Sequence, residues 1–157
     1  MNQIIFREKD WQELEQYLSR RKDVESGVYA LSKTSMSDTT NKFLVIRLII
    51  PNASDYLKRT SVRVAFRPEF TENVFQQCEA VRGHLLDIHT HPWSADVNFS
   101  GVDDHEAIHT KVPYLNKYLP DIMIGFIVFG KSLAIARARF WDKKTNRLSQ
   151  IDRITVI

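Results

Sequence analysis

The segment His89-Thr90-His91-Pro92 constrains the fold more than any other part of the sequence. The mostly apolar residues 84–88 before it predict a short buried strand, and Pro92 ends that strand because proline cannot donate to a sheet ladder. Side chains on a strand alternate between its two faces, so His89 and His91 point to the same side. The sequence therefore predicts two imidazoles side by side at the end of a strand.

Two further polar residues, Ser100 and Asp103, follow the histidines and open a helical pattern. Their spacing is typical of a capping box, in which Ser100 caps a helix and Asp103 lies near its positive end. Two neutral imidazoles and a carboxylate also make up the three protein ligands of a catalytic zinc, whose fourth position is left to water. The two interpretations are compatible, because a helix N-terminus holds a ligand carboxylate rigidly.

The order His89, His91, Pro92, Ser100, Asp103 resembles the signature of the JAMM/MPN+ (JAB-domain) zinc isopeptidases, in particular the prokaryotic type that acts on ubiquitin-like proteins. The resemblance implies that the two histidines and the aspartate bind Zn²⁺. It also implies that the serine helps to stabilise the tetrahedral intermediate. The spacing from the second histidine to the serine is one residue longer than the family pattern, a difference that a loop can absorb.

The family also has a glutamate on an earlier strand, just ahead of a small glycine-containing run, that acts on the zinc-bound water. Glu25, at the head of segment 25–31, resembles this residue, although Val28 stands where a second glycine is common. The resemblance assigns Glu25 as a general base that later returns the proton to the leaving amine. Zinc would lower the pKa of its water towards ~7.

The resemblance further implies the fold and the substrate. The fold would be MPN-like (cytidine-deaminase-like), with a mixed, largely antiparallel sheet flanked by helices. The substrate would be the bond after the extended C-terminal tail of a ubiquitin-like protein, which an exposed sheet edge can hold as an added strand. Cleavage of a conjugate and of a precursor both remain open. In a bacterium the expected setting is a ubiquitin-like antiphage pathway, with E1-like or E2-like proteins as further partners.

Two alternatives stand beside this hypothesis. One is a non-catalytic MPN module that scaffolds a complex, against which the intact set Glu25, His89, His91, Ser100 and Asp103 argues. The other is a processing enzyme for a sulfur-carrier protein, since nothing in the chain identifies the tail that it accepts.

A second histidine pair, in His105-Glu106-Ala107-Ile108-His109, has the His-Glu-x-x-His spacing of a helical zinc site. A gluzincin needs a downstream glutamate as third ligand, and no glutamate follows Glu106 in this sequence. Pro113 also cuts the helix short. We therefore expect these histidines to lie on the surface near the rim of the active site.

The remaining pattern predicts an α+β domain that spans residues 1–157, with 43% hydrophobic content to form its core. Helices are expected from a capping box at Asp10 to residue 22, over 68–83, and from Asp103 to a break at Pro113. Residues 35–41 and 54–60 read as loop and connection. Strands are expected at 3–7, 24–33, 43–50, 61–67, 84–91, 122–129, 133–141 and 150–157.

The formal net charge is +3, and the cations gather late in the chain. The favoured interpretation is a solvated strand edge guarded by basic side chains, and the alternative is a docking surface for an acidic protein. Aromatic residues do not interleave with these charges, which argues against nucleic-acid binding. The residues are Lys131, Arg137, Arg139, Lys143, Lys144, Arg147 and Arg153.

The single cysteine, Cys78, excludes an internal disulfide and falls on the apolar face of a helical pattern, so we expect it in the core. The N-terminus lacks the apolar run of a signal peptide, and the longest apolar run, 122–129, is too short to cross a bilayer. We therefore expect a cytoplasmic protein without a membrane partner.

Overall fold

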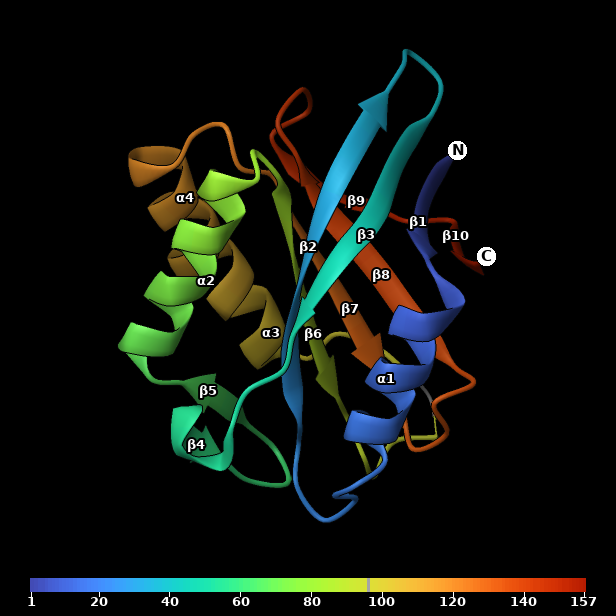
Figure 1. The fold of residues 1–157 in the computed structure, drawn as a ribbon, viewed down its shortest axis with the longest axis vertical. Coiled ribbons are helices and arrows are strands. Elements are labelled where there is room, and N and C mark those ends of the chain that lie inside the picture. The colour runs from blue at the N-terminus through green and yellow to red at the C-terminus, as the bar shows by residue number, and fades with distance from the viewer. Residues whose placement is uncertain (96) are drawn as a thin grey trace.

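A curled eight-stranded sheet organises the described residues, 1–95 and 97–157, of the computed structural model (Figure 1). Its strand order is β10-β1-β3-β2-β6-β7-β8-β9. β1 is parallel to both of its neighbours and β6 is parallel to β7, whereas the other neighbours are antiparallel. The strands are β1 (Asn2–Phe6), β2 (Gly27–Met36), β3 (Asn41–Ile49), β6 (His84–Thr90), β7 (Ile124–Phe129), β8 (Ala136–Asp142), β9 (Arg147–Gln150) and β10 (Arg153–Val156).

Helices cover both faces of this sheet, which agrees with the predicted α+β class, a largely antiparallel sheet flanked by helices (Figure 1). One face carries α1 (Glu8–Leu18), and the other carries α2 (Pro68–Ala80) and a helical segment of three parts. That segment consists of α3 (Gly101–Glu106), the π-helical turn η2 (Ala107–Lys111) and α4 (Val112–Tyr118). A short 3₁₀ turn, η1 (Ala53–Asp55), leads into a separate hairpin of β4 (Tyr56–Arg59) and β5 (Val64–Phe66).

The strand β6 is buried along nearly its whole length and divides the core in two. Its residues Leu86 and Ile88 belong to the cluster that packs under α1, whereas Leu85 belongs to the cluster under α2 and α4. Because side chains alternate along a strand, Asp87 and His89 share the face of Leu85. The histidine pair is therefore directed towards α2 and α3.

The predicted last strand, 150–157, takes in the last residue of β9 and all of β10, which lie at opposite edges of the sheet. β9 pairs with β8, and β10 pairs with β1. Between them, the Ile151 amide donates to the Ala138 carbonyl at 2.9 Å and the Asp152 amide donates to the Asn2 carbonyl at 2.8 Å. The chain thus steps from one edge to the other within two residues, which is possible only because the sheet curls its edges together.

The N-terminal helix also differs from the prediction. It begins at Glu8 and its N-cap, Arg7, makes no side-chain capping bond. The Asp10 carboxylate accepts a hydrogen bond from Arg7 Nε at 2.6 Å, so the predicted capping box is wrong. The helix ends at Leu18, before the predicted basic end at residue 22.

Three other predictions of secondary structure differ from the structure. The predicted connection 54–60 contains strand β4, and the predicted loop 35–41 is shortened because β2 continues to Met36. The expected break at Pro113 is absent: the chain stays helical from Gly101 to Tyr118. The π-helical turn widens the helix just ahead of Pro113, which has no N–H to donate.

Cys78 is fully buried in α2, as predicted. None of the helices in the described part of the chain is long and apolar enough to cross a membrane.

Candidate metal centre

The end of β6 and the start of β2 lie side by side and bring the first three site residues together. The antiparallel register pairs His89 with Gly27. One residue further along, the Thr90 amide donates to the Ser26 carbonyl at 3.0 Å. Continued for one more residue, this register places Glu25 opposite His91. Glu25 thus precedes the strand that was expected to contain it, but its position beside the histidines is the predicted one.

The side chains around this point stand at the separations expected of ligands to one metal ion. The Nε2 atoms of His89 and His91 are 3.2 Å apart. Asp103 Oδ1 lies 3.1 Å from His89 Nε2, and Asp103 Oδ2 lies 3.2 Å from His91 Nε2. Glu25 Oε1 lies 3.5 Å from His91 Nε2. Two ligand atoms of a tetrahedral zinc, each ~2.0–2.1 Å from the ion, lie ~3.3 Å from each other. All four distances between the side chains are close to this value.

Glu25, His89 and His91 are buried and form a group that can hold a metal ion. Asp103 contacts both histidines from the first turn of α3. Glu25 and Asp103 both contact His91, so the four residues that the sequence singled out lie together in space.

The predicted capping box at the start of α3 is confirmed. Ser100 Oγ accepts a hydrogen bond from the Asp103 amide at 3.1 Å, and Asp103 Oδ2 accepts one from the Ser100 amide at 2.7 Å. These bonds fix the Asp103 carboxylate relative to the helix. They also hold the Ser100 hydroxyl next to Asp103, which contacts both histidines.

The side chains of the cluster change one another's affinity for protons. Burial raises the pKa of Glu25 to about 7, although the two histidines act in the opposite direction. Burial alone would raise the pKa of Asp103, but hydrogen bonds from His89 and His91 hold it far below its usual range. Burial alone would lower the pKa of His91, but its hydrogen bond to Asp103 and the charge of that carboxylate raise the pKa above its usual value. A metal ion would displace protons from such a group, because it binds the deprotonated forms.

Strand β4 holds the backbone of Glu25 in place. The Glu25 amide donates to the Thr60 carbonyl at 2.7 Å, and Arg59 Nε donates to the Glu25 carbonyl at 3.0 Å. Arg59 Nη2 also donates to Ser26 Oγ at 2.7 Å. Sequence reasoning missed Arg59, because residues 54–60 read as a connection and nothing local links them to Glu25.

Trp93 is a second residue that the sequence analysis missed. Its ring stacks on that of His91, with the centroids 5.7 Å apart and the planes 10° from parallel. Its indole N–H donates to the Ser61 carbonyl, in the turn between β4 and β5. The side chain is 59% exposed, so an aromatic surface lies beside the cluster. The only signal was an aromatic residue directly after Pro92.

The helical histidine pair is separate from this cluster. His105 and His109 are both exposed, and their rings contact each other with centroids 4.8 Å apart. Glu106, which lies between them in sequence, accepts a hydrogen bond from Arg63 at 3.2 Å. Within residues 1–95 and 97–157, the pair joins no group of three metal-binding side chains.

Arg139 departs from the predicted solvated edge. Its side chain is only 16% exposed, and its Nη1 lies 2.7 Å from Asp104 Oδ1. The guanidinium stacks on Phe99, 3.8 Å from the ring centroid. Arg137, two residues earlier, is exposed as predicted. The late cations are therefore a mixed set, in which Arg139 braces α3 against β8.

Glu25→Gln is expected to stabilise the metal-free protein at pH 8 by on the order of 2 kcal/mol, and to change it little at pH 5. Burial raises the pKa of Glu25 from 4.5 to about 7. Between these values the folded state binds more protons than the unfolded state, so the Glu25 contribution to stability falls as pH rises. Glutamine cannot ionise. Urea denaturation of chelator-treated protein at both pH values measures the difference.

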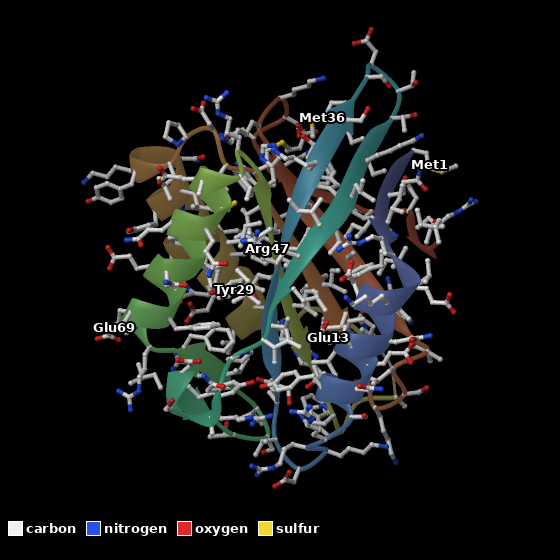
Figure 2. The ribbon with its side chains drawn as sticks, viewed as in Figure 1. Met1, Glu13, Tyr29, Met36, Arg47 and Glu69 are labelled. Carbon is white, nitrogen blue, oxygen red and sulfur yellow. The ribbon has the colours of Figure 1, made fainter. Side chains whose placement is uncertain are left out.

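Glu13→Gln is the control, because Glu13 is exposed on α1 (Figure 2). It should change the free energy of unfolding little at either pH. A Glu25→Gln effect that is the same at pH 5 and pH 8 would contradict the assignment of a raised pKa.

Comparison with family models and with curated proteins finds no match to this sequence. Among solved structures, the chain is similar to the solution structure of protein DSY2949 from Desulfitobacterium hafniense, a Northeast Structural Genomics Consortium target. The match covers 98% of this chain and 92% of that chain, with a TM-score of 0.60 and 12% sequence identity. At this identity the likeness concerns the fold alone.

Proposed function

We propose that this protein is a zinc-dependent peptidase of the JAMM/MPN+ type, with an MPN-like fold, that cleaves the amide or isopeptide bond after the tail of a ubiquitin-like protein. The observation that carries the proposal is the assembly of Glu25, His89, His91 and Asp103 within 3.1–3.5 Å contacts. These four residues come from three separate segments of the chain. The resemblance noted in the sequence supplies the reaction and the substrate class.

The donor set fits zinc, which binds imidazole nitrogens and carboxylate oxygens. We assign His89, His91 and Asp103 as the ligands, because the two Asp103 oxygens contact both histidines and the helix cap fixes the carboxylate. Glu25 contacts His91 alone, at 3.5 Å, the longest of the four contacts, and lines an adjoining cavity together with His89 and Asp103. When bound, zinc supplies a Lewis acid that polarises a carbonyl group and lowers the pKa of water.

The protein's own groups move the protons. Glu25 Oε1 takes a proton from the attacking water and returns it to the leaving amine, so that one carboxylate acts first as base and then as acid. Ser100 Oγ accepts from the Asp103 amide, which leaves its own proton free to be donated to the developing oxyanion. No covalent intermediate is required by this arrangement.

The β4–β5 hairpin offers a place for the substrate tail. Within the described residues it forms a separate two-stranded sheet that pairs with no third strand, so a substrate strand could add to it. Val64 and Phe66, on β5, line the cavity that also contains Glu25 and His89. A tail paired with this hairpin would thus run towards the metal centre.

The test uses zinc-loaded protein and reporter proteins fused after the Gly-Gly tails of ubiquitin-like proteins and of sulfur-carrier proteins. We expect cleavage after the tail, its loss with a zinc chelator and its return with added Zn²⁺. Which fusion is cut identifies the substrate class. Stoichiometric zinc without cleavage of any fusion would contradict a peptidase and favour the scaffold alternative.

A further inference from the structure

A cavity of about 410 Å³ adjoins the metal centre and extends along the sheet under α2 and α4. Glu25, His89 and Asp103 lie at one part of its wall, and Tyr29 of β2 lies at another. Figure 2 shows Tyr29 between β2 and α2. Pockets of this volume hold a substrate side chain or a small ligand, and their polar groups set its orientation.

Aromatic rings form much of the wall. Flat rings favour an aromatic occupant, because stacked and edge-to-face ring pairs add stabilisation beyond the area that they bury. The rings of two of these residues, Phe75 on α2 and Tyr114 on α4, stack 5.6 Å apart and bridge the two helices. The aromatic lining consists of Tyr29, Phe66, Phe75, Phe99, Tyr114 and Phe126.

An ion pair lies inside this aromatic enclosure. Lys111 Nζ, on the π-helical turn, donates to the buried Asp87 carboxylate, and both residues line the cavity. The Lys111 side chain is 33% exposed, and because it lines the cavity this exposure is available to an occupant. Burial alone would lower the pKa of Lys111, but Asp87 raises it, so the lysine stays charged. Neither residue contacts the metal centre, so the proposed chemistry leaves the pair without a role.

The charges of the cavity argue against an anionic occupant. Each cation in its lining is already paired with a carboxylate, and the further carboxylates Glu25, Glu72 and Asp103 also line the cavity, so an anion would be buried without a partner, which is costly. A cationic end placed at the ion pair would lie beside its lysine, so the end that meets the pair should be neutral. Burial and the Asp87 carboxylate raise the pKa of Tyr29 to about 12, which is consistent with a site that does not favour added negative charge. The pairs are Lys111 with Asp87, Arg63 with Glu106 and Arg139 with Asp104.

We infer that this cavity is a side-chain pocket for an aromatic substrate residue with a neutral polar end, as tyrosine has, and that Lys111 and Asp87 recognise that end. A hydroxyl group can accept a hydrogen bond from Lys111 and donate one to Asp87, which matches both members of the ion pair. The naming of the occupant as a substrate residue rests on the proposed function. The preference of the pocket does not, because it can be measured without turnover.

The test uses chelator-treated protein, so that no probe binds through a metal, and four para-substituted toluenes of similar size. They are p-cresol, p-xylene, p-toluate and 4-methylbenzylamine, which carry a neutral polar, an apolar, an anionic and a cationic end. Titration followed by NMR, with a crystal soak for position, should place p-cresol in the cavity. We expect it to bind roughly tenfold more tightly than either charged probe.

Lys111→Met/Asp87→Leu then tests the role of the pair. Replacing both partners avoids the unpaired buried charge that a single substitution leaves, so the fold should be kept. In this variant p-xylene should bind at least as tightly as p-cresol. Lys117→Met, at an exposed lysine of α4, should keep the wild-type order of the probes.

The inference is overturned if a charged probe binds the wild-type protein best, if p-cresol binds elsewhere, or if the double variant keeps the preference for p-cresol. These outcomes do not depend on peptidase activity. A protein that cleaves no fusion but prefers p-cresol in the cavity would contradict the proposed function and leave the pocket assignment standing.

Discussion

His91→Ala is expected to reduce the zinc content of the purified protein from about one ion per chain to none. The Nε2 atom of His91 lies 3.2 Å from both His89 Nε2 and Asp103 Oδ2, and 3.5 Å from Glu25 Oε1. It is therefore the one atom in contact with all the other members of the cluster. Loss of a group that only orients a metal ligand lowers affinity ~10–100-fold, so loss of the ligand itself should lower it further.

The measurement is metal analysis after dialysis, together with the shift in melting temperature on addition of Zn²⁺. The wild-type protein should be stabilised by the ion, because a ligand that binds only the folded state raises its stability. His91→Ala should lose this response.

His109→Ala is the matched control, since it makes the same substitution at an exposed histidine outside the cluster. It should keep full zinc content and the full thermal response. The opposite pattern, with zinc lost from His109→Ala and kept by His91→Ala, would move the metal site to the α3–η2 helix and make the protein a zincin.

Three residues of the candidate site could be predicted from sequence because each follows a local rule. The period of two places His89 and His91 on one face, and the capping box places Asp103 at the start of a helix. The structure confirms both: the Nε2 atoms of the two histidines are 3.2 Å apart, and the capping box is formed. Glu25 needed the family resemblance, because its approach to His91 depends on the pairing of β2 with β6.

The parts that sequence reasoning missed depend on contacts between distant segments. Arg59 reaches Glu25 only because β4 folds over the start of β2, and Lys111 reaches Asp87 only because η2 packs on β6. The error in the last strand has the same origin. Residues 150–157 read locally as one strand, and only the closeness of β8 to β1 shows that the chain changes edge at Ile151.

Glu25→Gln is expected to lower the turnover of a cleavable fusion by roughly a hundredfold or more, while zinc content and fold are kept. Glutamine preserves the size of the side chain and its hydrogen-bonding capacity, but it cannot take a proton from water. The backbone bonds from Arg59 and to Thr60 do not involve the side chain, so they hold the substituted residue in the same place. The measurement is kcat of the zinc-loaded variant, with zinc content determined on the same sample.

This substitution separates a base from a ligand, because the two roles predict different losses. A ligand carboxylate replaced by an amide should weaken zinc binding, and activity should then recover in part as Zn²⁺ is raised. A base replaced by an amide should leave zinc bound and the activity low at every zinc concentration. Asp103→Asn, made at the other carboxylate of the cluster, should show the first pattern.

A Glu25→Gln protein that cleaves at the wild-type rate would contradict the assignment of the base, whereas the metal centre formed by His89, His91 and Asp103 would remain. The same variant should also be more stable than the wild type at pH 8 without metal, since the buried carboxylate that costs stability is the group that catalysis requires.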